Sequence, residues 1–377
     1  MKASRNIEID CLRAIAVLLT VFAHSRLLFL WNPDWLTTIH RNALFGNGVD
    51  IFFVISAFVI TRSLRGKFTD GNLFSEQYKH FVVRRFWRLA PAALFFCAFY
   101  LAYSLISRSG EVGSFLLNLK NTVAVITLTA NLRDQSNLMA VYWTLASEWQ
   151  FYLIFPALLL AANKNLKLAR LGLLAFIGLL LIFAGSTKFV QLRFDCMLYG
   201  VLLAFIFDSQ AYRTYEPKFL ENRAIAVGVT LFSIFLVMFI PIALIDIPRS
   251  ILMGIVSINC TFLVWIASYD KNYFLGGYLK TILTYIGSRS YSIYLAHGPA
   301  LYMTHDLWYW AHNKTAADIT GGYTLRYTLT FILLVLIISE LSFRYLERPF
   351  AESLRRDKSS TKTPAKKETM STAQATI

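Results

Sequence analysis

The chain has 377 residues, a net charge of +15, and a composition in which 56% of the residues are hydrophobic. With a mean hydropathy of +0.51, this composition exceeds what a soluble domain carries and excludes a water-soluble globular protein. The four cysteines lie within or at the edges of apolar runs, at spacings that fit neither a metal site nor a disulfide framework, so we expect no bound metal.

Ten apolar runs follow one another along the chain, each near the length of a membrane-crossing helix. The expected spans are residues 12–31, 44–62, 89–107, 139–162, 168–186, 190–208, 224–245, 250–268, 284–305 and 325–346. A shorter, more polar run at 118–132 is expected to be interfacial or re-entrant, and the first run lacks a signal-peptide cleavage site. The sequence therefore predicts an all-α integral membrane protein, with a bundle of about ten transmembrane helices over residues 1–350 and a basic, disordered tail over 351–377.

Lysine and arginine are distributed unequally between the two sides of these spans. With a cytoplasmic N-terminus, 26 of the 37 basic residues fall in cytoplasmic segments and ten in the others, while Arg289 lies inside a span. Because basic residues accumulate on the cytoplasmic side of membrane proteins, both termini are expected there. Topology thus explains most of the net charge, and no nucleic-acid partner is expected. The sequence does not indicate an oligomeric state.

Arg13 and His24 stand eleven residues apart in the first apolar run. Eleven helical steps close to within about 20° of whole turns, so the two side chains share one helix face. A rise of about 1.5 Å per residue separates them by roughly 16 Å along the axis. An arginine near one membrane surface and a histidine beyond mid-bilayer predict two tasks at two depths.

Further ionisable residues lie inside the expected spans, where such residues usually face a polar interior and mark a function. Counting from the outer end of each span places His24, Asp50, Glu148 and His297 at depths of roughly 9 to 13 Å. We therefore expect two imidazoles and two carboxylates in one layer. For His24 and Glu148, the competing interpretation is a side chain that only ties helices together.

Three residues in or near this layer have more open roles. His297 precedes the helix-breaking Gly298 and Pro299, so its imidazole is equally well explained as a partner for freed backbone carbonyls. Arg193 and Asp195 enter the sixth span slightly above the layer, where they can pair with each other or contact an acceptor arriving from outside.

The cytoplasmic side carries a second, basic layer. Arg13 lies there, and Arg84, Arg85 and Arg88 lead into the third span through the stretch FVVRRFWRLAP. Arginine forks bind phosphate in a bidentate manner, so the cluster suits an anionic cytosolic ligand. The positive-inside distribution alone also accounts for arginines at this position.

Seven sequence blocks in order resemble the acyltransferase family 3 membrane proteins, which O-acylate glycans and other acceptors. The blocks are IEIDCLRAIAVLLTVFAH, GNGVDIFFVISAFVIT, FVVRRFWRLAP, VYWTLASEWQFYLIFP, RFDCMLYGVLLA, IGSRSYSIYLAHGPA and LSFRYLERPF. The departures are small: Cys11 and Ala57 stand where the family usually has glycine, and Thr144 where it often has serine.

The resemblance implies that Arg13 and His24 are essential, that Arg85 and Arg88 lie on the donor side, and that the donor is an acyl-coenzyme A, most often acetyl-coenzyme A. Within the same blocks, we assign an acceptor or structural site to Trp143, Arg193, Asp195, Tyr291 and His297. Some relatives carry a periplasmic esterase-like domain after the bundle, and we expect none in this chain.

The working hypothesis is O-acyl transfer to a glycan or lipid-linked glycan by a multi-pass protein of the plasma (inner) membrane, with no tightly bound cofactor. His24 would act as general base or as acyl carrier, oriented by Glu148 or Asp50. The alternative is a proton-coupled transporter, which also places ionisable residues in the membrane. The two separate layers and the lack of a convincing internal repeat weigh against it.

The basic asymmetry predicts which loops an impermeant thiol reagent reaches in intact cells once the native cysteines are replaced. Cysteines introduced at Lys67 and Lys164 should be shielded from the reagent. Cysteines at Asn137 and Lys314 should be labelled. Reversed labelling would place Arg13 outside, where no coenzyme A is available, and would end the hypothesis of transfer across the membrane.

Overall fold

The computed structural model of the protein describes residues 6–64, 74–107, 110–132, 141–163, 193–207, 209–274, 278–312 and 321–350. Within these ranges the chain is helical and contains no strand. The helices are α1 (Ile7–Ala23), α2 (Ser25–Leu28), α3 (Asp34–Asn42), α4 (Gly48–Leu64), α5 (Phe74–Tyr103), α6 (Phe115–Ile126), α7 (Trp143–Asn163), α9 (Phe194–Phe207), α10 (Gln210–Thr214), α11 (Arg223–Ala243), α12 (Arg249–Ser268), α13 (Tyr278–Ser288), α14 (Ser290–His312) and α15 (Thr324–Ser342), the last followed by a π-helical turn, η7 (Phe343–Glu347).

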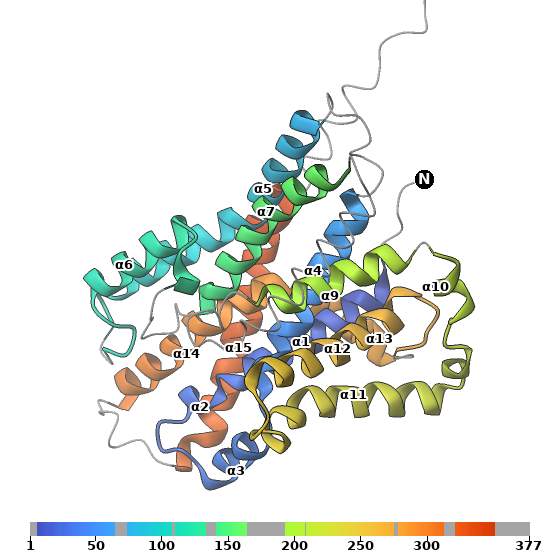
Figure 1. Ribbon diagram of the computed structural model, residues 1–377. Helices are drawn as coiled ribbons and strands as arrows, with labels where there is room; N and C mark the ends of the chain where they lie inside the picture. Colours follow the sequence, from blue (N-terminus) through green and yellow to red (C-terminus); the bar gives the residue numbers. More distant parts are fainter. Residues whose placement is uncertain are drawn as a thin grey trace, which may run out of the picture.

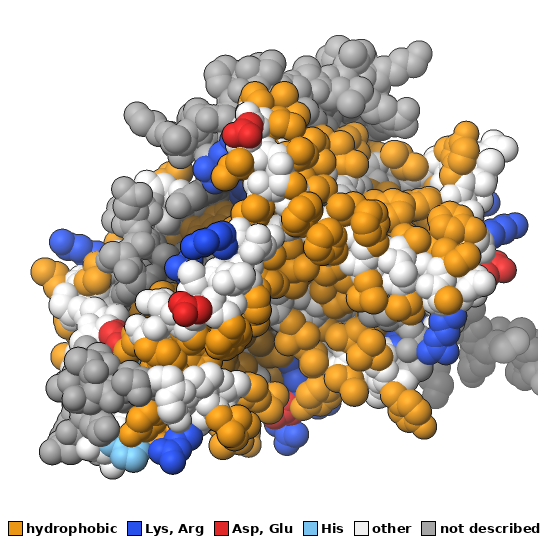
Figure 2. Space-filling model, turned by 90° about the horizontal axis from the view of Figure 1, so that it is seen from below, with side chains coloured by type: hydrophobic (Ala, Val, Ile, Leu, Met, Phe, Trp, Pro, Cys, Tyr) orange, Lys and Arg blue, Asp and Glu red, His pale blue; other side chains and the backbone are white. Residues whose placement is uncertain are grey.

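The chain is a multi-pass membrane protein. Five of its described helical segments are long and apolar enough to cross a bilayer: Phe45–Leu64, Tyr78–Tyr103, Arg223–Ala243, Ile251–Ser268 and Gly321–Phe350. Figure 2 shows hydrophobic side chains spread over much of one face of the molecule, as contact with lipid requires. The span expected at 168–186 and the tail at 351–377 lie outside the described residues. The count of ten spans and the side of the termini stay predictions.

The first helix is shorter than the sequence predicts. α1 ends at Ala23, and the backbone N–H of His24 bonds to the Val21 carbonyl at 3.1 Å, which tightens the last turn. His24 keeps right-handed helical dihedrals (φ −91°, ψ 0°). The eleven steps from Arg13 to His24 therefore remain helical, and the separation of roughly 16 Å along the axis holds. The run expected at 118–132 overlaps α6, which begins at Phe115 and whose 12 residues are too few to cross a bilayer.

α1 occupies the middle of the bundle, with α4, α12, α13 and α14 packed against it (Figure 1). Two glycines let neighbouring helices approach its backbone. A Cβ atom on Gly287 of α13 would lie 1.8 Å from the Asp10 carbonyl oxygen, and one on Gly48 of α4 would lie 2.6 Å from the Ala16 carbonyl oxygen. Small residues at such crossings are typical of helix packing in membranes. These contacts position the α1 backbone against α4 and α13.

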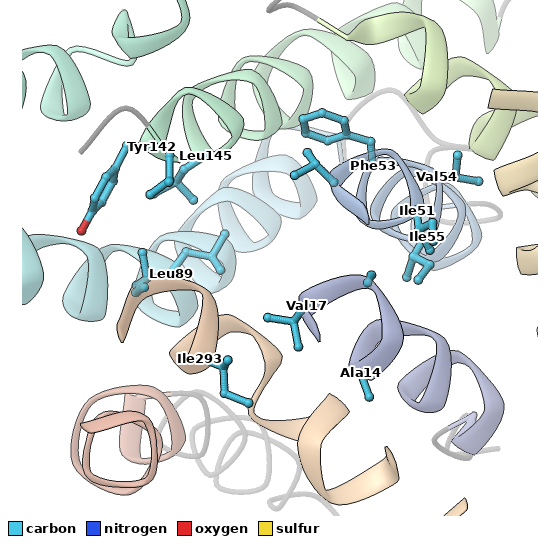
Figure 3. Close-up of a cluster of buried hydrophobic side chains, with 14 of the residues drawn as sticks. Ala14, Val17, Ile51, Phe53, Val54, Ile55, Leu89, Tyr142, Leu145 and Ile293 are labelled. Atoms are coloured by element: carbon cyan, nitrogen blue, oxygen red, sulfur yellow. The ribbon is translucent and has the colours of Figure 1, made fainter. Parts of the chain in front are cut away.

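The buried apolar cluster includes side chains of α1, α4, α5, α7 and α14. Figure 3 shows Val17 of α1, Phe53 of α4, Leu89 of α5, Leu145 of α7 and Ile293 of α14 in one region, although they are far apart in the sequence. Each of these side chains is less than 9% exposed. The same five helices line the cavity described below.

Because the Gly287 site has no room for a methyl group, Gly287→Ala should lower the melting temperature of the detergent-solubilised protein. Overpacking of this kind costs about 1–3 kcal/mol. Gly228→Ala on α11 is the matched control, since no atom lies within 4 Å of the added Cβ, and alanine is the better helix former. Equal melting temperatures for the two variants would show that α13 is not held against the α1 backbone.

Candidate functional site

A cavity opens between α1, α4, α5, α7, α13, α14 and η7, with a volume of about 820 Å³ including its mouth. Its lining combines three arginines, two glutamates, several hydroxyl groups and an apolar wall. The charged residues are Arg13, Arg85, Arg88, Glu148 and Glu347. The chain therefore brings together, in one place, the three arginines that the sequence assigned to the donor side.

The arginines come from two helices. Arg85 and Arg88 stand three residues apart on α5 and so share a face, while Arg13 projects from α1. The Arg85 guanidinium lies over the Tyr152 ring, 5.3 Å from its centre. The buried Arg13 Nε has no hydrogen-bond partner among the described residues, and its nearest carboxylate, Asp10, is 4.0 Å away. Grouped guanidiniums with unused N–H donors favour an anion such as phosphate.

Glu148 lies in this basic cavity and not in the histidine layer. Its Oε1 accepts hydrogen bonds from the hydroxyls of Ser56 and Tyr152, which are themselves 2.7 Å apart. Ser56 is six residues beyond Asp50 on α4, or about 9 Å along the axis. The predicted depth of Glu148 was therefore wrong.

The error has a structural cause. α7 begins at Trp143, whose ring packs edge-on against Phe53 at 5.8 Å, three residues into α4 from Asp50. The N-terminal end of α7 thus lies level with Phe53 and not with the start of α4 at Gly48, whereas counting from span ends assumes that the two helices start at the same level. Trp143, expected at an acceptor or structural site, lies in this helix contact.

Glu347 is a cavity residue that the sequence analysis did not single out. It is buried at the end of η7 and accepts a hydrogen bond from the Ser292 hydroxyl at 2.9 Å. Next to Ser292, Tyr291 lines the cavity and donates to the Leu89 carbonyl at 2.6 Å. The signal for Glu347 was its place in the block LSFRYLERPF, but helical periodicity does not predict the π turn that orients it.

His24 and His297 face each other, as the shared depth predicted, with ring centres 5.0 Å apart and an angle of 44° between the planes. The His24 Nδ1 lies 2.8 Å from the Thr20 carbonyl oxygen, and the His297 Nδ1 lies 2.5 Å from that of Tyr294. A carbonyl only accepts, so each Nδ1 carries the hydrogen and each neutral ring keeps its lone pair on Nε2. The Thr20 carbonyl therefore orients His24, and the expected orientation by Glu148 or Asp50 was wrong.

A third histidine lies close to this pair and was not singled out from the sequence. His40 of α3 stacks on Phe22 with ring centres 5.4 Å apart, and its Nε2 is 3.2 Å from the Ser25 hydroxyl. Burial, with the positive charge of Arg26, lowers the pKa of His40 below its usual range. Its surroundings therefore favour the neutral imidazole.

Asp50 forms an ion pair with Arg193. One Asp50 oxygen lies 2.8 Å from Arg193 Nη1, while Arg193 Nε is 3.4 Å from Asp195. Arg193 also donates to the Cys196 sulfur at 2.9 Å, and Cys196 contacts Ser257. The expected pairing of Arg193 with Asp195 is present. Through these contacts the buried side chains link α4, α9 and α12.

The histidine–carboxylate pair of His305 and Glu111 is unsuited to act as a base. His305 of α14 contacts Glu111 through Nδ1, but its Nε2 lies 3.0 Å from the Leu28 carbonyl oxygen. Because Nε2 must donate to that carbonyl, neither ring nitrogen offers a free lone pair to a substrate. The pair ties α2 and the segment before α6 to α14.

The cavity and the histidine pair are separated by one layer of side chains. Thr144 and Tyr294 line the cavity, and their hydroxyl oxygens are 2.7 Å apart. On the other side, the Tyr294 ring centre is 5.7 Å from that of His297. The order from the arginines outward is therefore cavity, Tyr294, His297 and His24. This arrangement places an anion-binding cavity beside a pair of imidazole lone pairs.

Comparison with known proteins gives one family over nearly the whole chain. The family described as "Acyltransferase domain" matches residues 6–341. The Staphylococcus aureus (strain NCTC 8325 / PS 47) protein named "O-acetyltransferase OatA" is 27% identical over 379 residues, covering 90% of this chain and 56% of the relative. The Staphylococcus aureus (strain COL) protein named "Putative O-acetyltransferase SACOL0978" is 26% identical over 372 residues, covering 91% and 56%.

The chain thus spans 56% of the length of these curated relatives. No solved structure matches it significantly. The family match extends over more than half of the chain, from α1 into α15. This protein belongs to acyltransferase family 3.

Because Asp50 is 1% exposed and paired with Arg193, Asp50→Ala should leave the buried guanidinium with only the longer contact to Asp195, at a cost of up to about 3–5 kcal/mol. The expected result is a melting temperature in detergent lower by several degrees. Asp50→Asn, which keeps a hydrogen-bonding oxygen, should lose less. An Asp50→Ala protein of normal stability but without transfer activity would return Asp50 to the catalytic role that the sequence suggested.

Proposed function

We propose that this chain transfers an acyl group, most often acetyl in this family, from cytosolic acyl-coenzyme A to a hydroxyl of an extracytoplasmic or lipid-linked glycan. The membrane would be the plasma (inner) membrane. One observation carries the proposal: a cavity with three arginines adjoins, through a single layer of side chains, a histidine pair with free Nε2 lone pairs. The names of the relatives support O-acetyl transfer.

In this proposal the arginines bind the phosphates of the donor. Arg13, Arg85 and Arg88 supply the N–H forks that phosphate oxygens accept. The separation of roughly 16 Å between Arg13 and His24 along α1 would be bridged by the pantetheine arm, which lies in the cavity. The thioester then reaches the neighbourhood of His24.

The chemistry follows from the tautomer of His24. Its Nε2 accepts the proton of the acceptor hydroxyl while the hydroxyl oxygen attacks the thioester carbonyl carbon. The new carbon–oxygen bond forms, the carbon–sulfur bond breaks, and the proton passes from Nε2 to the departing thiolate. In a second route the imidazole first accepts the acyl group and then releases it to the acceptor. Both routes need His24, and both give the same products.

The test uses membrane vesicles that contain the full chain and native acceptor, with release of the coenzyme A thiol as the readout. His24→Ala should reduce release by about 10²–10⁴-fold. Arg85→Lys keeps the charge but loses the bidentate fork, so the KM for acetyl-coenzyme A should rise. Mass spectrometry of surface glycans from cells with and without the protein would then identify the acceptor.

Arg344→Lys is the matched control, because Arg344 is exposed, lies outside the cavity and pairs with Glu340 at 2.5 Å. Its kinetic constants should stay those of the unmodified protein. An unchanged KM in the Arg85→Lys and Arg88→Lys variants would favour the positive-inside explanation. A chain that consumes no acetyl-coenzyme A while it moves a solute would be the proton-coupled transporter instead.

A further inference from the structure

The cavity changes character along its length. At one end, Ser56 of α4 and Glu148 of α7 lie among the arginines. Moving outward along α4, Val49 is seven residues from Ser56, or about 10 Å. Along α7, Thr144 is one turn from Glu148. The end of the cavity at Ser56 and Glu148 is therefore charged. The end at Val49 and Thr144 carries no charged side chain among its described lining residues.

The far end is apolar. Its sides are formed by Val49 and Phe53 of α4, Leu145 of α7 and Leu295 of α14. Figure 3 shows Phe53 and Leu145 within the buried hydrophobic cluster beside α1. A ligand with an anionic group at the arginines and a small apolar group at this end would match the lining along the whole length of the cavity. Burial of apolar surface there contributes about 25 cal/mol per Å².

A hydrogen-bonded pair closes the apolar end. The Tyr294 hydroxyl donates to the Val141 carbonyl at 2.7 Å and is 2.7 Å from the Thr144 hydroxyl, which can donate to it. Both bonds tie α14 to the start of α7. These contacts anchor the Tyr294 hydroxyl and hold its ring at the end of the cavity.

The same tyrosine touches the histidine pair. Its carbonyl accepts from His297 Nδ1, and its ring centre is 5.7 Å from the His297 ring. In the proposed reaction, the thioester carbonyl lies at the end of the cavity nearest the histidine pair, where the acceptor oxygen must meet it. The acyl chain that extends from this carbonyl then lies in the apolar end, against Tyr294.

We propose that Val49, Phe53, Leu145 and Leu295 form the acyl pocket, and that Tyr294, held by Thr144 and Val141, is the wall that sets acyl length. The inference rests on the proposed function and adds a specificity-determining residue to it. With the wall in place, the pocket takes short acyl groups. Without it, longer chains fit.

The experiment compares kcat/KM for acetyl-coenzyme A and butyryl-coenzyme A in the same vesicles. Tyr294→Ala should raise the ratio of butyryl to acetyl by at least about tenfold, because one methylene in an apolar pocket changes discrimination by roughly 10–200-fold. Tyr294→Phe keeps the ring but loses both hydrogen bonds, so it should raise the ratio less. Thr144→Ala removes one support of the wall and should act in the same direction.

Tyr291→Ala is the matched control for selectivity. Tyr291 also lines the cavity, three residues earlier on α14, but its hydroxyl bonds to Leu89 and not across the closed end. Its removal creates a similar volume, so turnover can change while the ratio of the two donors stays constant. A loss of general stability would likewise lower both rates together.

A Tyr294→Ala protein that turns over acetyl-coenzyme A with an unchanged ratio overturns the inference and leaves the proposed function standing. If that variant does not fold, Val49→Phe decides, because filling the pocket from the opposite side should lower the butyryl ratio further. An unchanged ratio in that variant also overturns the inference. Absence of any acyl-coenzyme A consumption by the unmodified protein would instead reject the proposed function itself.

Discussion

The structure depends on one constraint: guanidinium groups placed inside a low-dielectric bundle must find their compensation within the protein. Arg13 faces an interior cavity from the central helix α1, where α4, α12, α13 and α14 enclose it. Glu148 and Glu347 place two negative charges against the three arginines, and the Tyr152 ring covers Arg85. When all five groups are ionised, one positive charge remains in excess. The cavity therefore attracts anions without being an open basic surface.

The arrangement of α1 could be predicted from the sequence. Helical periodicity placed Arg13 and His24 on one face at two depths, and the structure keeps that geometry although the helix ends at Ala23. Residue counting also placed His24 and His297 at one depth, and the contact between their rings agrees with this. The arginine pair Arg85 and Arg88 follows from a spacing of three on one helix. These predictions needed only the periodicity of a single helix or, for the two histidines, two helices whose ends lie at the same level.

The carboxylates could not be placed in the same way. Glu148 was assigned to the wrong layer because α7 begins lower in the bundle than α4, and no local pattern reports that offset between helices. Asp50 pairs with Arg193 because three helices converge there, which is a tertiary property. Glu347 reaches the cavity through a π turn that the 3.6-residue period does not contain. Pairing choices among several buried charges are decided by packing, and one sequence carries little of that information.

The hydrogen bonds of the two histidines determine where the proton of the proposed reaction can go. Each Nδ1 is committed to a carbonyl of its own helix, and among the described contacts no carboxylate reaches the His24 ring. A proton that arrives on Nε2 thus has no acidic residue beside it to carry it toward either compartment. In the proposed reaction the proton leaves on the thiol of coenzyme A, so a turnover neither releases a proton nor takes one up. Acyl transfer of this kind would proceed equally well in a membrane without a proton gradient.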